Sequence, residues 1–224
     1  MKLTRLSGSQ VVAGKILVIF PGALGDFICF LPALEKLARG REVDLLARAE
    51  YADLLPATVV VRSLERYEIT RLFVPGAERD ERLRGFFGSY AFIYSWMGSG
   101  QPDFVRHLQV LSNDKLRIFP FRPSRLRVHM ADYYLSCLGE KRSRRIFPVI
   151  PLRSDALAWS HWFWQQSGLR EKRVLVLAPG SGAKEKNWSV RSYQAMADWW
   201  QRRVGGKVIV VLGPVEEERK EIEN

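Results

Sequence analysis

Short apolar runs alternate along the chain with longer amphipathic segments. The short runs are filled almost continuously by Val, Ile and Leu, which is typical of parallel strands that helices cover on both faces. The expected helices are 27–39, 78–87, 128–138 and 154–167. The expected strands are Ile16–Phe20, Val43–Ala47, Val59–Ser63, Arg71–Val74, Ala91–Tyr94 and Leu116–Phe119. The pattern therefore predicts an α/β fold built on a parallel sheet.

The same plan of strand, loop and helix starts again in the last third of the chain. It predicts a strand over Val174–Ala178, a helix over Val190–Arg203 and a strand over Val208–Leu212. Charged residues and two prolines between Arg145 and Pro151 indicate a linker. We therefore expect a Rossmann-like domain over 1–150, a linker helix over 151–172 and the start of a second domain over 173–224. This second domain is expected to be incomplete, because an open sheet usually needs about four or more strands.

Composition supports a folded chain without a membrane span. Of 224 residues, 47% are hydrophobic and 12% aromatic, enough for a packed core. The apolar runs are shorter than the ~20 residues that cross a bilayer. The first fourteen residues lack the apolar region of a signal peptide. Cys29 and Cys137 lie far apart in apolar patterns, which predicts buried, reduced thiols and a cytoplasmic protein.

The charge of the chain is strongly basic and unevenly distributed. The formal net charge is +11. The segment from Lys115 to Arg145 contains nine Lys and Arg residues but only two acidic residues, Asp132 and Glu140. Such a block attracts nucleic acid, anionic lipid headgroups or a phosphorylated glycan; alternatively, it is simply a solvated face. No RNA-binding motif, zinc knuckle or basic heptad helix accompanies the block, so nucleic acid is disfavoured as a partner.

The first β–α turn carries an isolated acid. The segment ILVIFPGALGDFICFLPAL places Asp26 where a strand ends and a helix begins, at the sheet edge where open α/β folds bind ligands. It is neither a G-x-G-x-x-G fingerprint nor a P-loop. Asp26 is either the N-cap of a helix that starts at Phe27 or a general base for a hydroxyl, and the two roles are compatible.

A second β–α loop, LAPGSGAKEKNWSVRSY, combines small residues with cations. Ser181 and Gly182 offer amide and hydroxyl donors, and Lys184 and Lys186 offer positive charge, as a diphosphate cradle requires. An ordinary β–α loop with Ser189 as the next helix's cap is the alternative. His107, His129 and His161 have no partners at metal-ligand spacing, so structural roles are expected for them. The Trp and Phe residues of 154–167 are expected to form the buried face of the linking helix.

Together the two loops resemble those of glycosyltransferase family 9, the ADP-heptose:lipopolysaccharide heptosyltransferases. The resemblance is carried by the L-G-D turn with its L-P-A-L helix and by the later PGSG…KNW segment. Two further segments of the family are similar to SYAFIYSWMGSG and RVHMADYYLSCLG. The resemblance implies a bacterial GT-B enzyme of two Rossmann-like domains. It also implies inverting, metal-independent transfer of a heptose, or a related sugar, from an ADP-sugar in lipopolysaccharide synthesis, with no cofactor.

Family roles carry over to individual positions of this chain. Asp26 matches the catalytic base, and the acceptor-side loop is Gly22, Ala23, Leu24 and Gly25. Ser181, Gly182 and Lys186 match positions that hold the donor phosphates, with Lys184 as a competitor for the lysine role. The anionic groups of a lipid A–Kdo-type glycolipid acceptor would contact Arg122, Arg125 and Arg127. The implied location is the cytoplasm, with peripheral contact at the inner face of the inner membrane.

Nothing in the chain corresponds to the family's later G-D-T-G-x-x-H-like segment, which helps hold the nucleotide sugar. We therefore expect these 224 residues to be inactive alone. One alternative function is a non-catalytic nucleotide- or glycan-binding protein that keeps the fold. Another is a nucleic-acid binder that uses the basic block.

Overall fold

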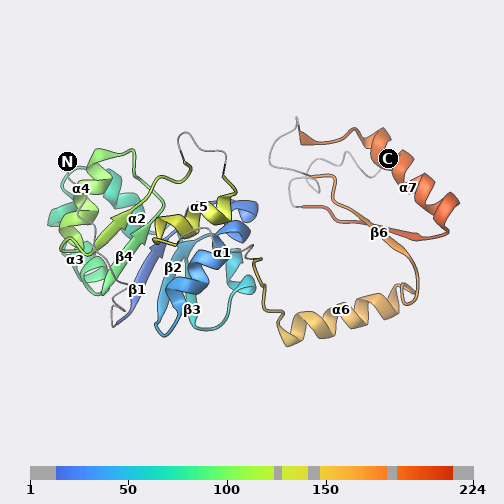
Figure 1. Cartoon of the computed structure of the whole chain (residues 1–224), viewed down its shortest axis with the longest axis horizontal. Helices are drawn as coiled ribbons and strands as arrows, with labels where there is room; N and C mark the ends of the chain where they lie inside the picture. The colour runs from blue at the N-terminus through green and yellow to red at the C-terminus, as the bar shows by residue number, and fades with distance from the viewer. Residues whose placement is uncertain (1–13, 124–127, 141–146, 181–185, 214–224) are drawn as a thin grey trace. The chain divides into compact units, whose positions relative to one another are not determined.

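The computed structural model describes residues 14–123, 128–140, 147–180 and 186–213 (Figure 1). The chain forms two compact units, Met1–Pro151 and Leu152–Asn224. The boundary between them lies next to the domain boundary expected at residue 150.

A parallel sheet forms the centre of the first unit, as predicted, but it has five strands in place of the six that the sequence suggested. Its strands are β1 (Ile16–Ile19), β2 (Val43–Ala47), β3 (Val59–Ser63), β4 (Phe92–Ser95) and β5 (Leu116–Ile118), in the order β3-β2-β1-β4-β5. The central strand β1 pairs in parallel with β2 and β4, so that Ile16 lies opposite both Val43 and Phe92. All four residues of β1 are fully buried, which explains their unbroken apolar sequence.

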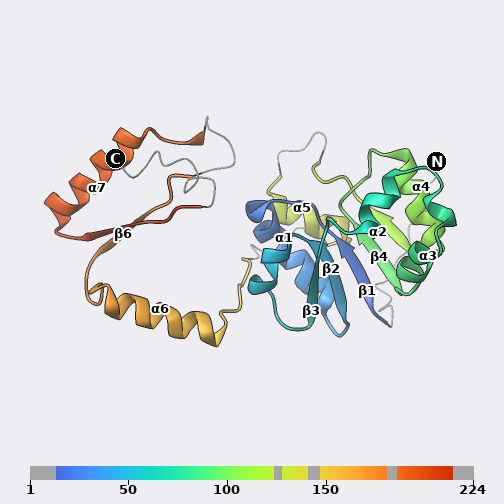
Figure 2. The ribbon, with the colours of Figure 1, turned by 180° about the vertical axis from the view of Figure 1, so that it is seen from behind.

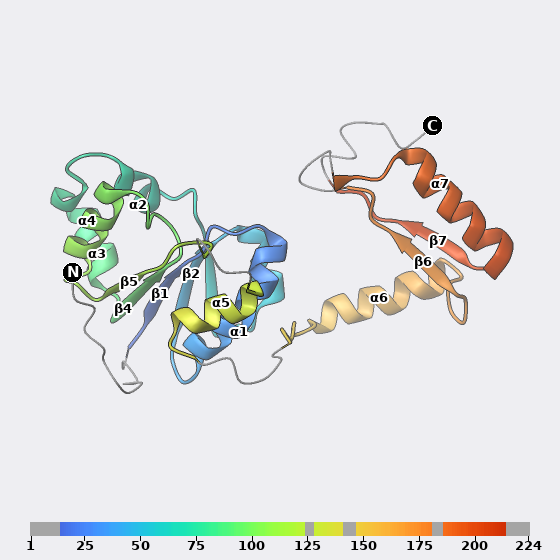
Figure 3. The same cartoon turned by 45° about the horizontal axis from the view of Figure 1, so that its top comes forward.

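Helices cover both faces of this sheet (Figure 2). One face packs against α1 (Leu24–Ala38), α5 (Met130–Cys137) and the 3-10 helix η1 (Ala49–Leu54), and α1 and α5 lie side by side (Figure 3). The other face packs against α2, η2, η3, α3 and α4, whose bounds are Tyr67–Thr70, Arg71–Phe73, Ala77–Arg79, Glu81–Gly88 and Pro102–Leu111. Alternate β1 residues supply the two cores: Ile16 and Val18 face α1, and Leu17 and Ile19 face α4.

Two elements of this second face differ from the prediction. The expected strand Arg71–Val74 is the 3-10 turn η2, in which Leu72 is buried and the Arg71 guanidinium donates to the carbonyls of Val74 and Pro75. The helix α4 was not predicted. Its buried positions 104, 107, 108 and 111 follow the helical spacing i, i+3, i+4, i+7, and Pro102 stands at its start.

The second unit contains α6 (Ser154–Gln166), β6 (Val174–Leu177), α7 (Val190–Trp199), the π-helical segment η5 (Trp200–Val204) and β7 (Lys207–Val210). The strands β6 and β7 pair in parallel. Ser189 caps α7 as predicted, because its hydroxyl accepts from the Ser192 amide at 3.1 Å. The prediction of a buried aromatic face on α6 is wrong for the described chain, since Trp159 and Trp162 are 60% and 56% exposed.

A nearly buried carboxylate links α2 to α3 in the first unit. The side chain of Glu68 is 5% exposed and accepts hydrogen bonds from the guanidinium groups of Arg66 (3.0 and 3.2 Å) and Arg82 (3.1 and 3.3 Å). The bonds from Arg66 are the main cause that lowers the pKa of Glu68 to about 2, against an opposing effect of burial.

This low pKa predicts acid lability. Because the folded-state pKa of Glu68 lies below its usual 4.5, its stabilisation is complete above that value and is lost as pH falls towards 2. The depression corresponds to about 3 kcal/mol. We expect Glu68→Gln to lower the melting temperature at pH 7 and to flatten its decline between pH 5 and 2. The exposed Glu65→Gln is the control, and equal pH profiles for wild type and Glu68→Gln would contradict the prediction.

Candidate functional site

The order of the strands places a crevice beside β1. The connection after β1 runs to α1 on one face of the sheet, whereas the connection after β4 runs to α4 on the other. Ligands of open α/β folds bind where neighbouring connections diverge in this way, outside the carboxyl ends of the strands. The segments at this edge are 20–23, after β1, and 96–101, after β4.

Asp26 lies at this edge in the first turn of α1. The helix begins at Leu24, its N-cap residue is Ala23, and the amide of Phe27 already donates to the carbonyl of Ala23 at 2.8 Å. The interpretation of Asp26 as the N-cap is therefore wrong, because the helix begins one turn earlier than the residues suggested. A carboxylate in the first turn still interacts favourably with the helix dipole. Its side chain is 20% exposed, so it is within reach of a ligand.

The turn before Asp26 is held rigidly. The buried phenol of Tyr51, from η1, donates to the carbonyl of Gly22 at 2.9 Å, and its ring stacks on Phe27 at 4.2 Å. Burial is the main cause that raises the pKa of Tyr51, which keeps this donor protonated at neutral pH. Of the predicted acceptor-side loop, Gly22 is buried, whereas residues 23 to 25 are exposed.

Aromatic side chains form the floor beneath Asp26. Phe20 stacks on Phe30 at 4.2 Å, and Trp96 meets Phe30 edge-on at 4.7 Å. Tyr134, from α5, packs edge-on against both phenylalanines at 5.5 Å. Burial raises the pKa of Tyr134, and the negative charge of Asp26 raises it further. The carboxylate therefore stands at the border between solvent and an apolar, low-dielectric floor.

Arg122 contacts Asp26 from the loop after β5. One guanidinium nitrogen, Nη2, donates to both carboxylate oxygens of Asp26, at 3.1 and 3.0 Å. The guanidinium also lies over the Phe121 ring, 5.4 Å from its centroid. The Arg122 side chain is 61% exposed, and such pairs typically contribute about 0–1 kcal/mol to stability. The structure thus brings together two of the predicted site residues that the family resemblance had given separate roles.

The other predicted site residues are only partly described. Ser181, Gly182, Lys184, Arg125 and Arg127 lie outside the described residues. Lys186 is exposed and belongs to the second unit, just before the helix α7 that Ser189 caps. Within the described ranges, no group of three or more His, Cys, Asp or Glu side chains is arranged to hold a metal ion. Among those same ranges, none of the helices has the length and hydrophobicity to span a membrane.

Two of the three histidines, and both cysteines, pack or hydrogen-bond within the first unit, whereas His161 on α6 is exposed. His107 is fully buried, with Nδ1 2.8 Å from the Leu72 carbonyl, and His129 accepts from the Ala131 amide as the N-cap of α5. The prediction of structural roles is confirmed for these two histidines. Cys29 and Cys137 are free thiols, as predicted, although both are only partly buried. Burial, followed by the charge of Asp26, raises the pKa of Cys29.

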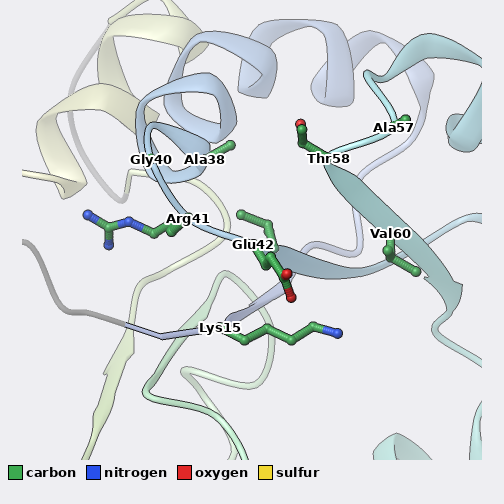
Figure 4. Close-up of a pocket in the computed structure, with 9 residues that line it drawn as sticks. Lys15, Ala38, Gly40, Arg41, Glu42, Ala57, Thr58 and Val60 are labelled. Atoms are coloured by element: carbon green, nitrogen blue, oxygen red, sulfur yellow. The ribbon is translucent and has the colours of Figure 1, made fainter.

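A separate hollow of about 630 Å³ lies at the opposite, amino edge of the sheet (Figure 4). Its lining includes Lys15, Arg41, Glu42 and Thr58. The Lys15 ammonium is 2.8 Å from the buried carboxylate of Asp44, and this contact and the Tyr90 hydroxyl help to lower the pKa of Asp44. The Lys15 ammonium is already paired with Asp44, and open α/β folds bind ligands at the carboxyl edge of the sheet rather than at this amino edge. We therefore assign the hollow a structural role.

Three aromatic residues of the site were not singled out from the sequence. Trp96 directly follows β4. Because ligands bind at the carboxyl ends of the strands, this position could have marked Trp96 as a site residue from the sequence. Tyr51 and Tyr134 gave no comparable signal, because a tyrosine in a helix pattern is equally typical of an ordinary core. Only the packing of η1 and α5 against α1 places them around Asp26.

Comparison with solved structures identifies the fold. A family 9 glycosyltransferase from Veillonella parvula DSM 2008 is similar with a TM-score of 0.69 at 18% identity, over 95% of this chain and 67% of that one. The E. coli ADP-heptose lps heptosyltransferase II is similar with a TM-score of 0.56 at 18% identity, over 91% of this chain and 66% of that one. The E. coli heptosyltransferase WaaC with ADP is similar with a TM-score of 0.50 at 15% identity, over 94% of this chain and 71% of that one. No protein-family model matches the sequence, and no curated protein sequence matches it significantly.

The chain therefore has the α/β fold of GT-B glycosyltransferases of the family 9 type, as the sequence predicted. It spans about two thirds of the length of these solved structures. At such low sequence identity the similarity establishes the fold, and the residues of the site must support any function.

Proposed function

We propose that this chain is the acceptor-binding and base-carrying part of a glycosyltransferase, with the start of its donor-binding domain. The enzyme would transfer a heptose, or a related sugar, from an ADP-sugar to a lipopolysaccharide core acceptor. The observation that carries the proposal is the position of Asp26. Its carboxylate is partly exposed above an apolar floor at the ligand-binding edge of the sheet, in a fold shared with glycosyltransferases.

In the proposed reaction Asp26 takes the proton of the acceptor hydroxyl. The acceptor oxygen forms a bond to the anomeric carbon of the sugar, and the bond from that carbon to the diphosphate breaks. ADP leaves with the electron pair, and this single displacement inverts the anomeric configuration. No metal takes part in the proposed step, so protein groups must stabilise the negative charge that grows on the diphosphate. We assign that role to Ser181, Gly182 and Lys186, with Lys184 as the alternative lysine.

The proposed acceptor is an anionic glycolipid of the lipid A–Kdo type. Arg122 lies beside Asp26 and is mostly exposed, which suits an arginine that meets a carboxylate or phosphate of the acceptor. Arg125 and Arg127 follow it in the sequence, and we propose that they contribute to the same anion recognition. We propose that the protein works in the cytoplasm, at the inner face of the membrane that holds this acceptor.

The proposal predicts acceptor-dependent release of ADP. The whole protein, incubated with ADP-heptose and a lipid A–Kdo-type acceptor, should release ADP and form a glycosylated product, both measured by chromatography. We expect the 224-residue chain alone to give no product, because it spans only about two thirds of the length of the similar solved glycosyltransferases. If the whole protein binds ADP in calorimetry but transfers no sugar from any nucleotide sugar, it is instead a non-catalytic nucleotide-binding protein. The proposed transfer would then be wrong.

A further inference from the structure

We infer that the Tyr134 hydroxyl is a further donor of this site, which holds the reacting oxygen of the acceptor while Asp26 takes its proton. The inference rests on the proposed function, because it concerns the same acceptor and the same base. It adds a substrate-positioning residue from α5 to the residues already assigned.

The hydroxyl of Tyr134 is buried without a partner. The side chain is fully buried, and its hydroxyl oxygen has no hydrogen bond to any residue that the structure describes. The large majority of buried polar side-chain atoms are paired, because an unpaired one loses its bonds to water without compensation. The adjacent Tyr133 shows the ordinary case, since its hydroxyl donates to the Pro120 carbonyl at 2.6 Å. Beside a ligand-binding edge, an unpaired donor suits a partner that arrives with the ligand.

The surroundings of Tyr134 hold this donor close to Asp26. Its ring packs edge-on against Phe20 and Phe30, both at 5.5 Å, and against Trp96 at 6.2 Å. Burial raises the pKa of Tyr134, and the nearby negative charge of Asp26 raises it further, so the phenol keeps its proton at neutral pH. No hydrogen bond joins the phenol to the Asp26 carboxylate. The proton of Tyr134 is therefore available to a third group.

An alcohol oxygen between these two groups satisfies both of them. A hydroxyl has one proton to donate and two lone pairs that accept hydrogen bonds. Asp26 accepts the proton, and Tyr134 donates to one lone pair while it keeps its own proton throughout. The second lone pair forms the bond to the anomeric carbon as ADP leaves. Two fixed hydrogen bonds restrict the position of the acceptor oxygen, and such positioning is a large part of the rate of a two-substrate reaction.

The acceptor reaches this hydroxyl after a side chain has moved, because the oxygen is closed to solvent in this structure. Arg122 is a neighbour that is able to move. Its charge also acts on the Tyr134 hydroxyl, and its side chain is 61% exposed. Exposed side chains change rotamer within ps–ns, and an ion pair as exposed as that of Arg122 and Asp26 is weak. The movement therefore costs little.

Removal of the hydroxyl should have opposite effects on stability and on rate. Tyr134→Phe takes away only an unpaired buried oxygen, so the melting temperature of the whole protein should stay the same or rise by about 2–4 °C. With ADP-heptose and a lipid A–Kdo-type acceptor, its kcat should fall about 10–100-fold, whereas the KM for ADP-heptose should not change. A purely structural role would not lower kcat in a protein that is at least as stable as wild type.

Tyr133→Phe is the matched control for stability, because it removes the paired hydroxyl of the adjacent residue in α5. It should lower the melting temperature by about 2–4 °C, opposite in sign to Tyr134→Phe. If wild type transfers sugar and Tyr134→Phe is equally fast, or if Tyr134→Phe melts below wild type, the inference is overturned and the proposed function stands. If wild type transfers no sugar, the proposed function is overturned and the inference with it.

Discussion

Replacing Gly22 with alanine is expected to lower the transfer rate about 100-fold and to destabilise the first unit by about 1–3 kcal/mol. A Cβ at Gly22 would lie 2.4 Å from the Phe20 ring and 2.9 Å from Cβ of Asp26. The Phe20 ring cannot move away easily, because it is fully buried and stacked on Phe30 at 4.2 Å. The turn must shift instead, and Asp26 shifts with it.

Gly25→Ala is the matched control for stability, since it adds the same methyl group three residues later. Apart from its chain neighbours and the backbone of its own helix, no atom lies within 4 Å of the added Cβ, and position 25 is inside the first turn of α1. Alanine favours a helix over glycine by about 1 kcal/mol in an interior position, so the melting temperature should stay the same or rise. Thermal unfolding and steady-state kinetics check both variants. A Gly22→Ala protein with wild-type stability and rate would show that the turn tolerates the methyl group.

The strands could be predicted from the sequence because their apolar runs are continuous. β2 and β3 have the predicted bounds, and β1, β4 and β5 differ by one residue at one or both ends. The prediction of a strand at Arg71–Val74 was wrong, because a short apolar run with one buried residue fits a turn as well as a strand. The helix α4 was not predicted, although its apolar positions have the spacing of a helix face.

The position of Asp26 at the ligand-binding edge could also be predicted, because it depends only on a strand, a turn and a helix that are adjacent in the sequence. Its contact with Arg122 could not, since the two residues are 96 positions apart and meet only after β5 has joined the sheet. The same holds for Tyr51, which reaches Gly22 across 29 positions. Local patterns place single residues, whereas the surroundings of a site come from tertiary packing.

Replacing Asp26 with asparagine should remove the proposed base and little else. Asparagine has nearly the same size and cannot take up the hydroxyl proton, so kcat should fall by about 10²–10⁴-fold. The fold should remain intact, because the lost ion pair with Arg122 is partly exposed and contributes only about 0–1 kcal/mol.

Asp103→Asn provides the matched control. Asp103 also lies in the first turn of a helix that follows a strand of the sheet, and its carboxylate is paired with an arginine, Arg106, at 3.6 Å. It is 68% exposed and has no part in the proposed chemistry. The control variant should retain the wild-type rate, which separates the loss of the base from a general loss of negative charge at a helix start.

The most direct test of the proposed base is therefore the kcat of the whole protein for transfer from ADP-heptose, with Asp26→Asn and Asp103→Asn measured together. We predict that Asp26→Asn keeps wild-type melting and ADP binding but transfers sugar about 10²–10⁴-fold more slowly. An Asp26→Asn protein that turns over as fast as wild type would contradict the assignment of the base, whatever sugar the enzyme uses.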